Sequence, residues 1–172
     1  GCFGLTEPDH GSDSVALETT ARRDGSAYVI DGAKRWIGLG HVADLVIIWA
    51  RDTADAKVKA FVLEKGADGQ YPEGYSAEAI TGKIAKRAIQ QAHIEISGLR
   101  IPAGNKLAKS TSFRDVSAIL NRTRSTGAWE ALGARFNPRS MPLFGAARAR
   151  RRHCAVLGGK TGARNAASCE AN

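Results

Sequence analysis

The sequence has little from which a metal site, a disulfide framework or a membrane anchor could be built. Three cysteines, Cys2, Cys154 and Cys169, match neither zinc nor disulfide spacing, and the body of the chain suits a reducing compartment. The four histidines form no metal-ligand spacing, so we assign no metal. No apolar run approaches the roughly 20 residues of a membrane span, and no signal-peptide pattern is present. An initiator methionine is missing as well, so we expect the chain to be part of a longer protein.

Acidic side chains are scarce near the C-terminus. From Arg135 onward eight basic side chains accompany one acidic residue, Glu170, so this segment carries +7 of the net charge of +8. Residues 1–134 therefore carry only +1, and the basic balance describes a tail rather than a nucleic-acid-binding domain. The tail has no hydrophobic period. We consider two origins for it: a reading-frame shift near Arg135 in a GC-rich gene, or a disordered basic extension that contacts nucleic acid or anionic lipid.

The body of the chain contains many short strand patterns separated by glycine-marked turns. Residues 45–50 are apolar throughout, so we expect this strand to be buried on both faces. Strands this short and frequent predict a mainly β fold, an antiparallel β-sandwich or barrel. The predicted strands are residues 2–5, 17–23, 28–30, 34–37, 45–50, 57–63, 92–96 and 99–101, with turns at Asp24-Gly25, Asp31-Gly32 and Ser97-Gly98.

The composition changes after Leu107. Residues 112–115 have the S-x-x-D form of a capping box, and apolar residues then recur at helical spacing to Leu132, which predicts one helix over residues 113–132. One helix cannot bury its own apolar stripe. We therefore divide the chain into a β domain of residues 1–107, a linker and helix of residues 108–134, and an irregular tail of residues 135–172.

The first thirteen residues join an apolar run to a polar turn. Pro8 and Gly11 force the backbone to leave the sheet there, and Thr6 and Ser12 stand where the strand opens into a loop. Backbone N–H groups without a ladder partner must find another acceptor, so a polar, planar cofactor could bind at this junction. Simple turn closure is the alternative role for the same residues.

Three ordered motifs carry a resemblance. TEPDHGSD at residues 6–13, KRWIG at residues 34–38 and ADLVIIWA at residues 43–50 resemble the middle domain of flavin-dependent acyl-CoA dehydrogenases and oxidases. The likeness runs from Gly1 to about Gly133 and is closest to glutaryl-CoA dehydrogenases and short-chain acyl-CoA oxidases. It implies that the helix is the first of a truncated C-terminal helical domain.

The resemblance implies a set of site residues. FAD would bind along Phe3, Leu5 and Thr6, whose hydroxyl would donate to the ring, and against Trp36, Ile37 and Gly38 from a second strand. Gly38 stands where many family members have threonine, so one side-chain hydrogen bond is missing. Ser12 matches the serine that bonds the CoA arm, and Asn121 and Arg124 match a helix segment that contacts the acyl-CoA.

The resemblance also implies what this chain does not contain. The family's catalytic base is a glutamate late in the helical domain, so we assign no catalytic residue here. The parent protein would oxidise an acyl-CoA to the enoyl-CoA as a homotetramer or homodimer, in the cytoplasm, mitochondrial matrix or peroxisome. Electron-transfer flavoprotein or, in an oxidase, oxygen would accept its electrons. The alternatives are a non-catalytic flavin- or acyl-CoA-binding module and a basic interaction protein that uses the tail.

Overall fold

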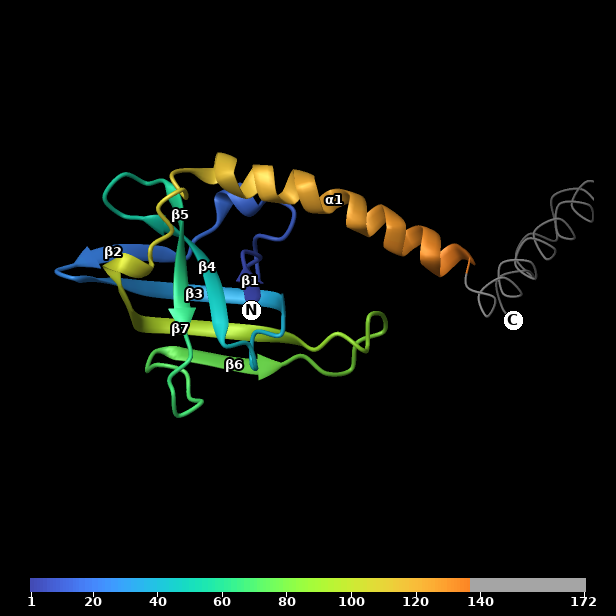
Figure 1. Cartoon of the computed structure of the whole chain (residues 1–172), viewed down its shortest axis with the longest axis horizontal. Helices are drawn as coiled ribbons and strands as arrows, with labels where there is room; N and C mark the ends of the chain where they lie inside the picture. Colours follow the sequence, from blue (N-terminus) through green and yellow to red (C-terminus); the bar gives the residue numbers. More distant parts are fainter. Residues whose placement is uncertain (137–172) are drawn as a thin grey trace, which may run out of the picture. The chain divides into compact units, whose positions relative to one another are not determined.

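The computed structural model describes residues 1–136 of the chain (Figure 1). The chain divides into two compact units, of which the first is Gly1–Ile119 and the second begins at Leu120. Both hypotheses about the basic tail concern residues that lie almost entirely outside the described part. The domain boundaries at residues 107 and 134 stay predictions.

Within residues 1–136, seven strands form one mixed sheet that does not close into a barrel, which confirms the mainly β fold. The strand predicted at residues 45–50 lies within β4. It is not buried on both faces along its whole length, because its first residue, Leu45, is exposed. Two short 3-10 turns, η1 (Ser14–Ala16) and η2 (Ala103–Asn105), flank the sheet. The strands are β1 (Cys2–Gly4), β2 (Thr20–Asp24), β3 (Ala27–Gly38), β4 (Leu45–Asp52), β5 (Val58–Glu64), β6 (Tyr75–Ala79) and β7 (Gln91–Pro102).

β4 organises one end of the sheet. It pairs with β5 in antiparallel fashion, and its residues 46–48 and 51–52 pair in parallel with β1 and β2, respectively. β2, β3, β7 and β6 continue the sheet as antiparallel neighbours. Because β1 ends after three residues, the chain that follows it runs beside β3 without a regular ladder. That junction positions the candidate site.

The turns predicted at Asp31-Gly32 and Ser97-Gly98 are wrong, because these residues lie inside β3 and β7, which are each continuous twelve-residue strands. The register shifts between Ile30 and Gly32, as in a β-bulge, and the strand continues through Asp31. Gly98 has a φ of +62° within β7, and its N–H donates to Asp31 Oδ1 at 2.7 Å. Glycines that permit positive φ serve bulges as well as hairpin turns, so the sequence pattern alone could not separate the two.

β6 corresponds to none of the strands predicted from the sequence. Its sequence, YSAEA, is poor in β-branched residues, which removes the usual composition signal. It pairs with the edge of β7, where Tyr75 stands opposite Ile96. The Tyr75 side chain is buried, so this strand contributes to the core.

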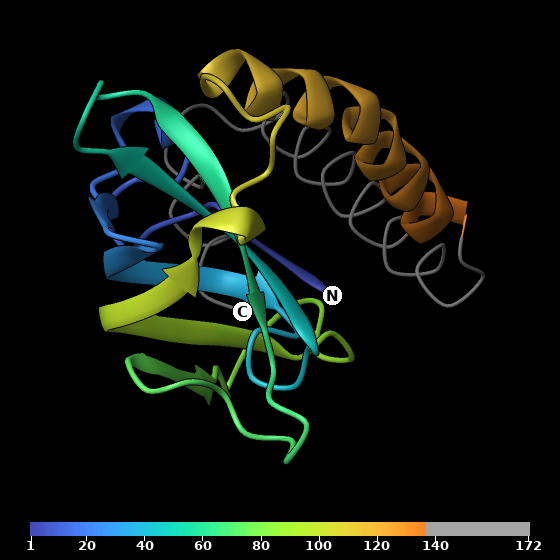
Figure 2. The same cartoon turned by 60° about the vertical axis from the view of Figure 1, so that its left-hand side comes forward.

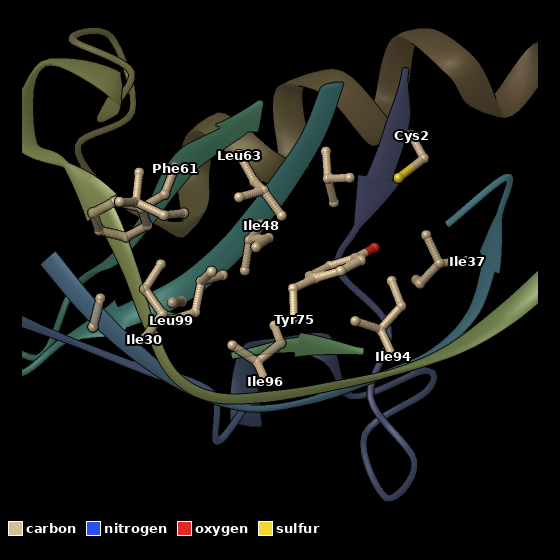
Figure 3. Close-up of a cluster of buried hydrophobic side chains, with 14 of the residues drawn as sticks. Cys2, Ile30, Ile37, Ile48, Phe61, Leu63, Tyr75, Ile94, Ile96 and Leu99 are labelled. Atoms are coloured by element: carbon tan, nitrogen blue, oxygen red, sulfur yellow. The ribbon is translucent and has the colours of Figure 1, made fainter. Parts of the chain in front are cut away.

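The core lies between the two ends of the folded-over sheet. β4 and β5 cross over β3 and β7 at a steep angle (Figure 2), and apolar side chains from both pairs point toward one another (Figure 3). The Tyr28 and Phe61 rings pack with centroids 4.8 Å apart across this space. Cys2 is buried in the same cluster, and burial raises the pKa of its thiol, as suits an inert core residue.

The predicted helix is confirmed and runs four residues further, as α1 (Phe113–Phe136). Asp115 Oδ2 accepts the backbone N–H groups of Thr111 and Ser112 at 2.7 and 3.0 Å, so the acidic half of the capping box forms. These backbone bonds lower the pKa of Asp115. The Ser112 hydroxyl accepts the Arg114 N–H at 3.3 Å rather than that of Asp115. Residues 121–133 of the helix are exposed. Within residues 1–136, no helix is long and apolar enough to cross a membrane.

The alignment of β6 with β7 can be tested at Gly74, which precedes β6 with a φ of +88°. A Cβ there would lie 2.5 Å from the Ser97 carbonyl oxygen, whereas Gly69, at a φ of +76°, has open space around it. We expect Gly69→Ala to cost roughly 1–2 kcal/mol through its backbone conformation alone. Gly74→Ala should cost about 2 kcal/mol more because the backbone must shift. Urea unfolding of both variants measures the difference, and equal costs would contradict the β6 alignment.

Candidate functional site

Thr6 and Trp36 lie on neighbouring segments at the junction between β1 and β3. The Arg35 N–H donates to the Thr6 carbonyl at 2.8 Å, which ties the two segments together one residue before Trp36. The Thr6 side chain is partly exposed and makes no hydrogen bond within residues 1–136. Its hydroxyl is therefore available to a ligand.

Trp36 has a backbone conformation that bulky residues rarely adopt. Its φ is +64°, within a register shift of β3 between Lys34 and Ile37, and 48% of the residue is exposed. Such a conformation costs roughly 1–3 kcal/mol and persists where the surroundings hold it. The Arg35 guanidinium lies over the indole at 5.4 Å, and the Gln91 side-chain amide donates to the Trp36 carbonyl at 3.3 Å. The bulge thus presents a broad aromatic face at the surface.

Two predicted site residues, Phe3 and Gly38, line one hollow of about 590 Å³. Leu45 and Ile47 add apolar surface to its wall. Phe3 and Ile47 also line a second hollow, of about 360 Å³, with Trp49. The Phe3 and Trp49 rings pack at 5.8 Å, and the buried Trp49 N–H has no hydrogen-bond partner among the described residues. Phe3 therefore separates two apolar hollows on one face of β1 and β4.

The other predicted residues are placed differently. The Leu5 and Ile37 side chains are buried, and Figure 3 shows Ile37 within the core, so either could contact a cofactor only through backbone atoms. Ser12 is exposed in the loop after Glu7. Asn121 and Arg124 are exposed on α1, in the part of the chain that belongs to the second unit. The structure thus brings Thr6 and Trp36 together, and Phe3 and Gly38 together.

A buried ion pair lies directly beneath the Thr6–Trp36 junction. Lys34 Nζ is 2.8 Å from Glu7 Oε1, and the side chains are 0% and 5% exposed. Glu7 also accepts the backbone N–H groups of Glu18 and Thr19, at 2.7 and 3.0 Å, and the Thr19 hydroxyl. Lys34 Nζ donates additionally to the Leu5 carbonyl at 3.2 Å. A single carboxylate therefore connects β3 to both the β1 junction and the segment before β2.

Both members of the pair have shifted pKa values. Burial opposes ionisation of Glu7, but the Lys34 charge and the bonds from Glu18, Lys34 and Thr19 outweigh it and lower the pKa of the carboxyl group. Burial, against the attraction of Glu7, lowers the pKa of the Lys34 ammonium to about 8. Both groups are charged at neutral pH. We did not identify this pair from the sequence, because nothing in its spacing shows that residues 7 and 34 meet.

Two tyrosines brace the loop that follows Gly38. The Tyr75 hydroxyl donates to the Gly40 carbonyl at 2.6 Å, and the Tyr71 hydroxyl donates to the Ala43 carbonyl at 2.9 Å. Neither tyrosine lies in a predicted strand or in one of the motifs, so sequence reasoning missed both. Since bracing fixes the end of β3, the tyrosines support the position of Gly38.

No group of three metal-ligating side chains occurs within residues 1–136. The arrangement instead offers an exposed indole, an available hydroxyl and apolar hollows. These can pack against a planar aromatic ligand and supply it with a hydrogen bond.

Comparison with protein families identifies a match over residues 2–99 to the model described as acyl-CoA dehydrogenase, middle domain. The short-chain-specific acyl-CoA dehydrogenase of Clostridium acetobutylicum is 35% identical over 137 residues, covering 77% of this chain and 35% of that protein. The glutaryl-CoA dehydrogenase of Desulfococcus multivorans is 30% identical over 139 residues, covering 77% and 34%. The chain thus spans about a third of the length of the curated relatives that it matches.

Solved structures agree with the sequence relatives. A glutaryl-CoA dehydrogenase from Mycobacterium smegmatis superposes with a TM-score of 0.71 at 37% identity, covering 78% of this chain and 33% of that chain. A structure of a glutaryl-CoA dehydrogenase from the same organism in complex with FADH2 gives a TM-score of 0.66 at 34% identity, covering 72% and 30%.

The buried pair predicts a specific pH dependence. Glu7→Gln leaves the Lys34 charge uncompensated, which should lower the free energy of unfolding by about 3–5 kcal/mol at neutral pH. Because folding lowers the pKa of Glu7 from 4.5, its contribution is present above that pH and is lost as the pH falls through the folded value. The difference in the free energy of unfolding between wild type and Glu7→Gln should therefore be smaller in acid. Urea unfolding at about pH 7 and about pH 3 measures this difference.

The exposed pair of Arg100 Nη1 and Asp24 Oδ2, at 2.7 Å, provides a control. Asp24→Asn should change stability far less than Glu7→Gln, because solvent screens exposed pairs. If Glu7→Gln lowers the free energy of unfolding by the same amount at both pH values, the assignment of Glu7 as the ionised partner of Lys34 is contradicted.

Proposed function

Because the chain belongs to the acyl-CoA dehydrogenase family through its middle domain, we propose that it forms one wall of an FAD and acyl-CoA site. The parent enzyme would oxidise an acyl-CoA to the 2,3-enoyl-CoA. The observation that carries the proposal is the exposed, positive-φ Trp36, tied by a backbone bond to the segment of Thr6. Bulky residues in such conformations gather at ligand-binding sites.

The residues of this chain fit a flavin in stated roles. Bound FAD supplies the hydride acceptor of the reaction. The Thr6 hydroxyl would donate to the polar edge of the ring, and the Trp36 indole would pack against its face. Phe3, Leu5, Ile37 and Gly38 would complete the contact with apolar surface and backbone.

The acyl-CoA would be held by polar side chains. The exposed Ser12 hydroxyl would bond the CoA arm. Asn121 and Arg124 are exposed and three residues apart on α1, so they share a helix face that could contact the same substrate. We propose domain boundaries at residues 107 and 134, and a tail of residues 135–172 whose origin sequencing of the locus would decide.

The parent protein's partners follow from the same proposal. It would assemble as a homotetramer or homodimer and pass electrons to electron-transfer flavoprotein, or to oxygen if it is an oxidase. Its compartment would be the cytoplasm, or the mitochondrial matrix or peroxisome of a eukaryote. A non-catalytic flavin- or acyl-CoA-binding module is the second candidate, since no side chain of this chain is assigned as the catalytic base.

The isolated chain should bind FAD weakly and turn over no acyl-CoA. Most of the proposed flavin contacts and the base would lie in other parts of the parent, and the remaining contacts must still overcome several kcal/mol of lost freedom on association. Calorimetric titration with FAD and a dye-reduction assay with butyryl-CoA and glutaryl-CoA measure both properties. Turnover of either substrate by the purified chain would show the assignment of the base to be wrong.

Thr6 and Trp36 should affect a full-length parent enzyme differently. Thr6→Val removes a hydroxyl that would form a stronger hydrogen bond to the reduced flavin than to the oxidised flavin. The reduced state should therefore be destabilised by on the order of 1 kcal/mol more than the oxidised state. The reduction potential should fall by about 20 mV, since 30 mV corresponds to about 1.4 kcal/mol for two electrons. Trp36→Leu removes packing area from both states, so FAD affinity should fall while the potential moves less. Spectroelectrochemical titration measures both, and an unchanged potential in a folded Thr6→Val variant would make Thr6 only a turn residue.

A further inference from the structure

We propose that the buried Glu7–Lys34 ion pair is a positioning device, which fixes the Thr6 hydroxyl relative to the Trp36 ring. The inference rests on the proposed function, because those two groups are assigned there to the flavin. Glu7 and Lys34 are buried, so neither would contact the flavin directly; both would act through their sequence neighbours.

Three consecutive residues on one segment are bonded to two consecutive residues on the other. Lys34 Nζ donates to the Leu5 carbonyl at 3.2 Å and to Glu7 Oε1 at 2.8 Å. Between these contacts, the Arg35 N–H donates to the Thr6 carbonyl at 2.8 Å. Thr6 is thus held on both sides by one ammonium group and at its own carbonyl by the adjacent backbone.

The same ammonium group lies at the start of the strained bulge. The register of β3 with β7 shifts immediately after Lys34, and Trp36 has its positive φ within that shift. A strained conformation needs surroundings that over-determine it. Lys34 is fixed before the bulge by its bonds to Leu5 and Glu7, and Glu7 is fixed in turn by Thr19.

A buried ion pair is better suited to positioning other groups than to increasing the stability of the fold. Replacing both members of a buried pair with neutral groups of similar shape is often neutral for stability, whereas removing one member is costly. Stability and positioning can therefore be separated. The double variant Glu7→Gln/Lys34→Met removes both charges and the donor to Leu5 but keeps most of the buried volume.

The control is a second ion pair of similar kind. Lys59 Nζ lies 2.7 Å from Asp52 Oδ2, with side chains 13% and 3% exposed, on the β4–β5 hairpin. Asp52→Asn/Lys59→Met removes that pair, and with it the bond from Lys59 Nζ to Asp55 Oδ2 at 2.9 Å, without touching the junction. Each 172-residue variant is measured by urea unfolding, by NMR hydrogen exchange of the Arg35 amide, and by titration with FAD followed through the Trp36 indole signal and the flavin absorption band.

We expect Glu7→Gln/Lys34→Met to be more stable than Glu7→Gln alone. Exchange of the Arg35 amide should nonetheless accelerate about tenfold in the double variant, because its acceptor is no longer held. FAD affinity should fall about tenfold, with loss of the wild-type shift of the flavin band, because the contacts are no longer preorganised. The control variant should change neither the Arg35 exchange rate nor FAD binding.

A folded double variant with wild-type Arg35 exchange would overturn the proposal. So would equal effects in the control variant. If wild type shows no FAD-dependent change at Trp36, the assignment of Trp36 to flavin binding in this chain fails, and the exchange measurement still decides whether the pair positions the junction. If the double variant does not fold, Thr19→Val removes one hydrogen-bond donor to Glu7 and leaves the Glu7 and Lys34 charges paired with each other. Unchanged Arg35 exchange in that variant overturns the proposal as well.

Discussion

The junction of this molecule depends on the desolvated charge of Lys34. An ammonium group with no exposure must find partners for its three N–H donors, and it finds two across the junction, the Glu7 carboxylate and the Leu5 carbonyl. Glu7 in turn satisfies the backbone N–H groups of Glu18 and Thr19, where the chain approaches β2. One pair of charges thus closes a place where three segments meet and no regular ladder forms.

The sheet supplies the frame in which such a junction can exist. β4 holds β1 and β2 in succession, so the chain between them must leave the sheet and return. β3 passes beside this excursion and bulges at Trp36. A regular ladder here would satisfy the backbone but would point alternate side chains to opposite faces. The bulge instead re-aims an indole to the surface, beside the Thr6 segment.

Local pattern predicted most of the strands and the helix, because alternation, apolar runs and a capping box are local signals. The continuity of β3 and β7 could not be predicted, since Gly32 and Gly98 permit a bulge or a turn equally, and the choice depends on the neighbouring strand. β6 was missed because YSAEA is stabilised by its pairing with β7 and by Tyr75 burial, not by its own propensity. For the candidate site, motifs predicted Thr6 and Trp36, whose segments the structure joins by a backbone bond, but the Glu7–Lys34 contact spans 27 residues and depends on the tertiary fold.

Three unusual features lie close together at this junction. Trp36 has a positive φ, Lys34 is a charge without exposure, and the Thr6 hydroxyl has no partner. Single features of this kind also occur elsewhere in the described residues: Leu39, Ala56 and Lys86 have positive φ, and the buried Trp49 N–H has no hydrogen-bond partner. At the junction, three of them coincide. Natural sequences accept local conflict mainly where function requires it. The strain, the buried charge and the unpartnered hydroxyl are all adjacent to the same backbone bond, from Arg35 to Thr6. This coincidence, rather than any single feature, supports the proposal that the junction contacts the flavin.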